Sequence, residues 1–119
     1  ELKEWGADCA VELHFNSASP SARGHEWLYW HSSSSGKNLA DLIRGEYEAT
    51  YPESPDRGSK PIDSGSRGGG FCRYTHCPSV IAEPFFGSNE KDWDVASSTK
   101  SSMAACIADG IDYWVAAQN

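Results

Sequence analysis

A histidine stands in a short stretch that otherwise has the pattern of a half-buried strand. Residues 9–15 alternate between apolar and polar or small side chains, so Glu12, His14 and Asn16 share one face of the predicted strand. Imidazole nitrogens are common zinc ligands, and a carboxylate two residues away can serve as a further ligand or contact the histidine. His14 is therefore a candidate metal ligand; the alternative interpretation is a solvated strand face.

A glutamate follows the most apolar short run of the chain. Residues 80–82 stand between two prolines and predict a central strand buried on both faces, which Glu83 ends. In open α/β sheets, ligands bind at the carboxyl ends of strands. Burial would raise the pKa of Glu83 toward neutrality, where a carboxyl group acts well as a general acid and base. The competing interpretation is an ion pair of Glu83 with Arg67 or Arg73.

Together these two residues match the needs of metal-assisted hydrolysis. A zinc ion bound by His14 would activate a water molecule, and Glu83 would accept its proton. Catalytic zinc normally takes three protein ligands, so His14 needs partners, and Glu12 is one candidate. The other histidines, His25, His31 and His76, fall in predicted loops or at strand ends, which is more typical of surface residues.

The elements that must position these residues follow from apolar periodicity and turn residues. We expect strands at Cys9–Phe15, His25–Trp30 and 80–82, and amphipathic helices at 32–51 and 97–117. The first two strands would be antiparallel if they pair, because the loop between them is short. Residues 52–70, rich in Pro, Gly and Ser, predict a long loop. This order predicts one α/β domain: a mixed sheet flanked by helices in three layers, α/β/α.

Composition excludes several classes of partner. With 10 basic and 17 acidic residues, the formal net charge is −7, which disfavours a nucleic-acid partner. No stretch is long and apolar enough for a membrane span, and no signal-peptide pattern is visible. The four scattered cysteines predict reduced thiols, although Cys72 and Cys77 flank a short segment in which a disulfide, or a metal pair with His76, is an alternative.

Five stretches, taken in order, resemble the zinc-dependent N-acetylmuramoyl-L-alanine amidases of bacterial and phage cell-wall lysis. They are "VELHFNSA", "GHEWLYW", "LADLI", "PSVIAEPFFGSN" and "IADGIDYW". The similarity runs along essentially the whole chain, and it corresponds to about the later two thirds of such a domain. The resemblance implies that residues 1–119 are the C-terminal portion of an amidase catalytic domain, with its N-terminal part before Glu1.

The resemblance also implies roles for individual residues. His14 matches the last zinc ligand of the family, and Glu83 matches its catalytic glutamate. Asn16 and Glu26 match frequent family positions that are structural or support the site. Zinc is the implied cofactor, and its two other ligands, a histidine and a glutamate, are expected upstream of this sequence.

The implied reaction is hydrolysis of the amide between N-acetylmuramic acid and the L-alanine of the stem peptide, at the bacterial cell wall. Peptidoglycan is then the substrate, with no nucleic-acid or membrane partner. Arg67, in the glycine-rich loop before the last strand, either contacts the glycan or a peptide carboxylate or is simply solvated. Two alternatives stay open: a zinc carboxypeptidase or other peptide amidase on the same scaffold, and a non-catalytic wall-binding or structural module without a complete metal site.

Overall fold

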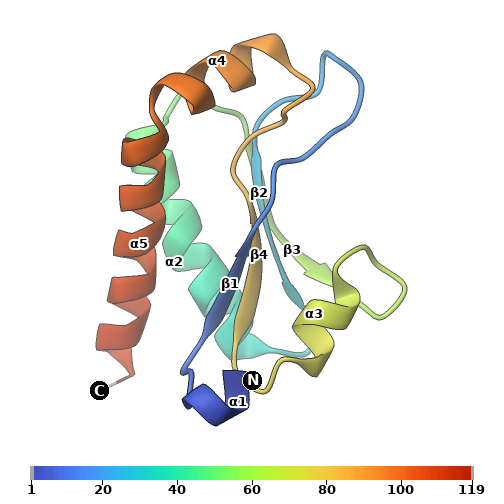
Figure 1. Ribbon diagram of the computed structural model, residues 1–119, viewed down its shortest axis with the longest axis vertical. Helices are drawn as coiled ribbons and strands as arrows, with labels where there is room; N and C mark the ends of the chain where they lie inside the picture. The colour runs from blue at the N-terminus through green and yellow to red at the C-terminus, as the bar shows by residue number, and fades with distance from the viewer. Residues whose placement is uncertain (1, 119) are drawn as a thin grey trace.

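Four strands form one mixed sheet in the computed structural model, which describes residues 2–118. The elements along the chain are α1 (Leu2–Trp5), β1 (Ala10–Leu13), β2 (His25–Trp30), α2 (Ser34–Thr50), β3 (Asp56–Ile62), α3 (Gly69–Tyr74), β4 (Ser79–Glu83), α4 (Glu90–Ser98) and α5 (Lys100–Ala117). The strand order is β1-β4-β2-β3 (Figure 1). β4 runs parallel to β1 and antiparallel to β2, and β3 runs parallel to β2.

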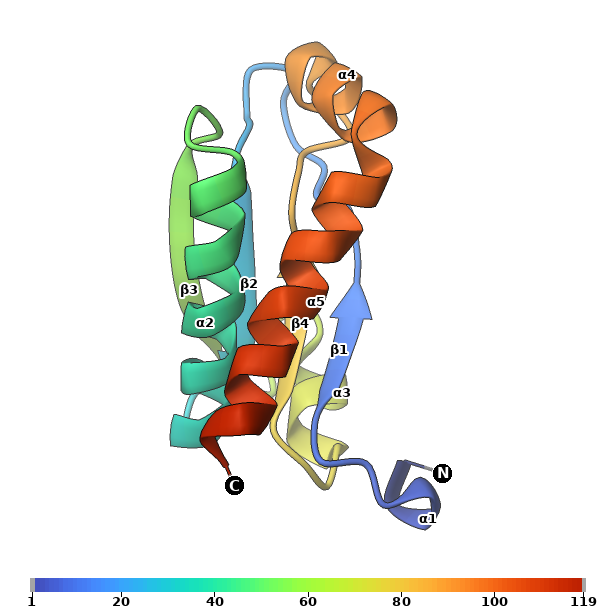
Figure 2. The ribbon, with the colours of Figure 1, turned by 90° about the vertical axis from the view of Figure 1, so that its left-hand side faces the viewer.

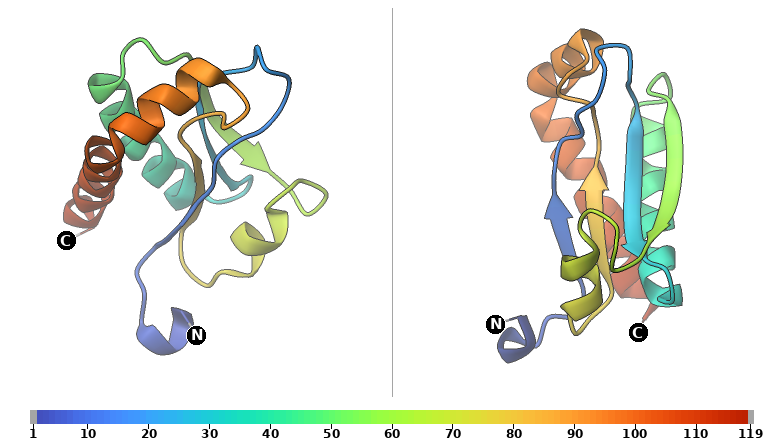
Figure 3. Two further views of the ribbon diagram at one scale, coloured as in Figure 1. Left: turned by 45° about the horizontal axis from the view of Figure 1, so that its top comes forward. Right: turned by 90° about the vertical axis from the view of Figure 1, so that its right-hand side faces the viewer.

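Helices cover both faces of this sheet. α2 and α5 lie side by side on one face, and α3 lies on the opposite face near the start of β4 (Figures 2 and 3). The larger core joins the sheet to α2 and α5, with Trp27 fully buried and Trp114 only 4% exposed. A smaller cluster between α3 and the sheet contains Ile62, Cys72 and Ile81. The predicted three-layer α/β/α domain is confirmed.

The predicted central strand is confirmed as β4. All five of its residues are buried, and it lies between β1 and β2. Because β4 occupies this position, β1 and β2 do not pair with each other. An apolar run buried on both faces is what an interior strand between two helical layers requires.

The predicted helix at 32–51 is α2, and local signals set both of its ends. The Ser33 side chain accepts a hydrogen bond from the Gly36 N–H, which is an N-cap. The helix ends at Thr50, because the ring of Pro52 disfavours helical geometry at the residue before it, Tyr51.

Gly110 allows α2 and α5 to approach each other closely. A Cβ built on Gly110 would lie 2.5 Å from the Cα of Ile43. Gly110→Ala should therefore lower the free energy of unfolding by about 1–3 kcal/mol, because the backbones must separate. Gly45→Ala is the matched control: its Cβ would meet nothing within 4 Å, and the helix propensity of alanine should stabilise it by up to about 1 kcal/mol. Urea denaturation of both variants measures the difference, and equal effects would contradict the close packing.

The prediction of a loop over 52–70 is wrong. β3 and the start of α3 lie within this range. β3 contains Gly58 and Pro61 and lacks apolar alternation, so its pattern is not that of a strand. It forms because it is an edge strand paired only with β2, where a proline without an N–H is tolerated.

Two further boundaries differ from the predictions. The first strand is shorter than Cys9–Phe15, and Leu13 and Phe15 are 66% and 60% exposed, because β1 is an edge strand whose end is not covered by residues 2–118. The helix expected at 97–117 is α5, but α4 before it was missed. α4 has few apolar residues and buries only Asp92 and Ala96, so it lacks a clear periodic signal.

All four cysteines are free thiols in the structure, as predicted. Cys72 and Cys106 are buried, and Cys9 and Cys77 are half-buried. Burial is the largest cause of the raised pKa of each thiol. Among residues 2–118, no helix has the length and apolar character needed to cross a membrane.

Candidate active site

His14 lies directly after β1 at the edge of the sheet. Its backbone N–H donates to the Ala82 carbonyl at 2.9 Å, which continues the β1–β4 ladder by one residue. The His14 Nε2 lies 2.5 Å from Glu12 Oε1. The His14 side chain is 32% exposed and that of Glu12 is 41% exposed. The structure thus brings together an imidazole nitrogen and a carboxylate oxygen, which is a donor pair that suits zinc.

Glu83 ends β4 on the neighbouring strand. The residue is 5% exposed, and its carboxyl group forms no hydrogen bond or ion pair with the residues that the structure describes. Burial raises the pKa of the Glu83 carboxyl above its usual value, and the nearby Glu26 raises it further, whereas Arg67, His14 and Lys60 lower it. A buried carboxyl with a raised pKa and no fixed partner is suited to exchanging a proton.

The competing interpretation of Glu83 as an ion-pair residue is not supported by the geometry. Arg67 acts on Glu83 only at longer range, through its charge. The guanidinium of Arg73 lies over the ring of Trp30, with 6.0 Å between the guanidinium carbon and the ring centroid.

Glu26 faces Glu83 directly across the β2–β4 ladder. The Glu26 side chain is 10% exposed, and its Oε2 lies 2.7 Å from Lys60 Nζ on β3. Its other oxygen accepts a hydrogen bond from the Asn16 side-chain amide and lies 4.0 Å from Arg57 Nε. Both carboxylate oxygens of Glu26 therefore face hydrogen-bond donors or cations.

The candidate residues named from the sequence thus gather on one face of the sheet. Glu83 shares the face of Ile81, two residues before it, which packs under α3. Glu26 shares this face as the cross-strand partner of Glu83, and Asn16 reaches Glu26 from the segment after β1. α3 lies beside the start of β4 and does not extend to its carboxyl end (Figure 3).

Two cations of this face, Arg57 and Lys60, were not identified from the sequence. Both lie in the range that was predicted as a loop, so nothing placed them on a strand. Had β3 been recognised, the alternation along it would have put Lys60 and Ile62 on one face.

A second group of possible metal ligands lies on the other face of the sheet. One ligand atom each of His25, Glu48 and Asp56 lies within 4.8 Å of the others. The Trp27 indole N–H donates to His25 Nδ1 at 2.8 Å, so the proton of the neutral ring is on Nε2, which contacts Glu48 at 2.6 Å. A metal on Nε2 would force a proton onto Nδ1, against the indole N–H. The donor set of this group therefore does not fit a metal ion.

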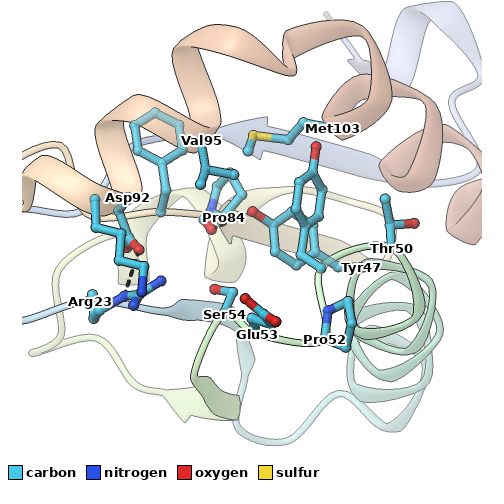
Figure 4. A pocket seen from close by; sticks show the side chains of 13 residues that line it. Arg23, Tyr47, Thr50, Pro52, Glu53, Ser54, Pro84, Asp92, Val95 and Met103 are labelled. Atoms are coloured by element: carbon cyan, nitrogen blue, oxygen red, sulfur yellow. Dashed lines mark hydrogen bonds and ion pairs between the residues drawn. The ribbon is translucent and has the colours of Figure 1, made fainter.

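A hollow of about 320 Å³ also lies on the side of the sheet that carries α2 and α5, between the end of α2, α4 and the segment after β4. Figure 4 shows its lining, with the ion pair of Arg23 Nε and Asp92 Oδ1 at 3.0 Å on one wall. Asp92 is 4% exposed and also accepts hydrogen bonds from the backbone N–H groups of Gly24 and Phe86, at 2.9 and 3.0 Å. Asp92 thus ties α4 to the start of β2 and to the segment that follows Glu83.

Asp92→Ala should lower the free energy of unfolding by about 2–4 kcal/mol, because two buried N–H groups lose their acceptor. Asp94→Ala is the control on the same helix, since Asp94 is exposed and the expected change is within about 0.5 kcal/mol. Chemical denaturation of the two variants provides the comparison. Equal stability of both would show that Asp92 does not anchor this end of the sheet.

A sequence profile of N-acetylmuramoyl-L-alanine amidases matches residues 2–113. The chain is 34% identical over 111 residues to YqiI of Bacillus subtilis (strain 168), an uncharacterized protein. The alignment covers 89% of this chain and 50% of YqiI. The CwlD amidase from Clostridioides difficile, solved in complex with the GerS lipoprotein, superposes with a TM-score of 0.83 at 24% identity, over 93% of this chain and 56% of CwlD.

The catalytic domain of CwlV, an N-acetylmuramoyl-L-alanine amidase from Bacillus (Paenibacillus) polymyxa var. colistinus, has a TM-score of 0.81 at 25% identity, over 96% of this chain and 61% of that one. The chain therefore spans about half to three fifths of the length of these relatives. The profile match extends over nearly all of it. On this evidence the chain belongs to the N-acetylmuramoyl-L-alanine amidase family.

Proposed function

We propose that this chain is the later part of the catalytic domain of a peptidoglycan hydrolase, which cleaves the amide between N-acetylmuramic acid and the L-alanine of the stem peptide. The observation that carries the proposal is the position of Glu83, which is buried and without a fixed partner at the end of β4, next to β1, which His14 directly follows. Family membership supports the substrate class. The site of action is then the bacterial cell wall, outside the cytoplasm.

Zinc is the cofactor that the donor chemistry suits. His14 would hold it through Nε2, with Glu12 as a neighbouring carboxylate. Bound zinc would polarise the scissile carbonyl and lower the pKa of a water molecule to about 7. Among residues 2–118, the three-donor group lies elsewhere, so the described part of the chain supplies one or two of the three ligands that catalytic zinc needs.

The residues of this chain supply the proton transfers. Glu83 accepts a proton from the attacking water and later delivers one to the amine nitrogen of the departing L-alanine. Burial raises the pKa of the Glu83 carboxyl, which favours an exchange of protons over a permanently ionised carboxylate. Arg67, exposed in the loop before α3, would attract a carboxylate of the stem peptide through its charge.

The test is digestion of purified peptidoglycan by the longest natural polypeptide that contains these residues. Mass spectrometry should find stem peptides with a free amino-terminal alanine, and a chelator should abolish their release. Loss of a carboxyl-terminal amino acid instead would identify a carboxypeptidase. Wall binding without any product would identify the non-catalytic module. The observation behind this alternative is that, among the described residues, only Glu12 joins His14 as a metal-ligating neighbour.

Residues 1–119 on their own should bind zinc weakly and release no stem peptides. His14 and Glu12 are two donors, and a two-donor site holds zinc far less tightly than a three-ligand catalytic site. Calorimetric zinc titration and the digestion assay check this directly. Strong, chelator-sensitive amidase activity from the 119-residue chain would contradict it.

A further inference from the structure

The Asn16 side chain hydrogen-bonds to Glu26, although Asn16 follows β1, Glu26 lies on β2, and these two strands are not neighbours. The strand order is β1-β4-β2-β3, so β4, which carries Glu83, lies between them. We propose that Glu26 is a positioning residue: anchored by Lys60, it holds Asn16 across the end of β4 and so fixes the end of β1, with His14, relative to Glu83. This inference rests on the proposed amidase function.

The anchoring of Glu26 is stronger than that of an ordinary surface carboxylate. Its side chain is 10% exposed, Lys60 contacts one oxygen at 2.7 Å, and Arg57 lies 4.0 Å from the other. Both cations come from β3, on the far side of β2 from Glu83. A nearly buried carboxylate is costly unless it is paired, so these contacts leave Glu26 with one favourable arrangement. The Asn16 amide therefore meets a fixed acceptor.

Asn16 in turn connects the two segments that carry the reactive residues. Its backbone N–H donates to the Phe85 carbonyl at 2.8 Å, and its carbonyl accepts from the Gly87 N–H at 2.8 Å. Asn16 follows His14 by two residues, and Phe85 follows Glu83 by two. A displacement of Asn16 is thus transmitted to both sides of the site. Displacements of about 1 Å at a catalytic centre cost about 100-fold in rate.

The direct test compares Glu26→Ala with Glu26→Gln in the longest natural polypeptide that contains these residues. Glu26→Ala removes the acceptor of Asn16, so we expect kcat per bound zinc to fall about 10- to 100-fold with KM within about twofold. Glu26→Gln keeps a carbonyl oxygen for Asn16 but loses the ion pair with Lys60, which is 43% exposed and becomes solvated. We therefore expect a smaller fall in kcat than for Glu26→Ala, to within about threefold of wild type. Asn16→Ala should behave like Glu26→Ala.

Lys37→Met is the matched control, since it removes an exposed ion pair with Asp41 on α2, 2.7 Å long, away from this face. It should leave kcat and KM unchanged. A role confined to stability would lower the amount of folded protein in Glu26→Ala but not kcat per bound zinc, and that result would overturn the inference. A raised KM with unchanged kcat would also overturn it, because it would indicate substrate contact.

A second measurement needs neither zinc nor activity. In the zinc-free chain, NMR should show slow exchange of the Asn16 side-chain amide protons, which becomes about tenfold faster in Glu26→Ala and stays slow in Glu26→Gln. Equal exchange in all three proteins would overturn the inference. An inactive wild-type enzyme would instead overturn the proposed function, while the exchange measurement would still decide whether Glu26 holds Asn16.

Discussion

Replacement of Glu83 by glutamine should lower the rate of peptidoglycan hydrolysis by at least about 100-fold while zinc stays bound. Glutamine has nearly the same shape but cannot accept a proton from water or pass one to the leaving amine. In the proposed mechanism Glu83 accepts the proton and His14 binds the zinc ion. Rate and metal content should therefore respond differently to this change.

The same replacement should stabilise the zinc-free chain near neutral pH. Burial raises the pKa of the Glu83 carboxyl, so the folded state binds this proton more tightly than the unfolded state does. Stability then falls as the pH rises from the unfolded pKa through the folded pKa, and the loss is complete above both. A neutral glutamine avoids that loss, so Glu83→Gln should be more stable than wild type at pH 7 and show a flatter pH dependence.

Stem-peptide release per bound zinc, together with denaturation at several pH values, measures both effects. Glu90→Gln is the control, because Glu90 is exposed at the start of α4. It should leave the rate unchanged and, through the lost interaction with the helix dipole, lower the stability by less than about 1 kcal/mol. If Glu83→Gln digested cell walls at the wild-type rate, the proton acceptor would have to be another residue.

The parts of the fold that could be predicted are those in which one chemical signal dominates. The apolar run of β4 and the Leu39–Ile43–Tyr47 stripe of α2 are buried in the core, and burial is what such patterns encode. β3 and α4 were missed because their stability comes from neighbours. β3 depends on its pairing with β2, and α4 depends on Asn89 as its cap and on the buried Asp92.

The candidate site was partly predictable for a related reason. His14 and Glu83 are polar residues at the ends of apolar strands, a local contrast that is visible in one sequence. Lys60 lacks such a contrast, and its position became clear only when β3 was placed beside β2. The hydrogen bond between Asn16 and Glu26 also depends on strand order, since β4 comes last of the four strands in the chain but lies between β1 and β2.

His14→Ala should remove zinc from the longest natural polypeptide that contains these residues, and amidase activity with it. The change deletes the imidazole ligand, and the other ligands alone bind zinc far more weakly. The His14 side chain is 32% exposed and lies after the end of β1, so the fold should lose little stability, within about 1 kcal/mol. Loss of metal with retained fold would separate a ligand from a structural residue.

His31→Ala is the matched control, because His31 is an exposed histidine just after β2. Elemental analysis after dialysis should find about one zinc per chain in wild type and His31→Ala, and much less in His14→Ala, with circular dichroism unchanged in all three. Added zinc should not restore wild-type activity to His14→Ala at concentrations that saturate the control. Full zinc content in His14→Ala would exclude His14 as a ligand, and the contact with Glu12 would then be an ordinary hydrogen bond on a solvated strand face.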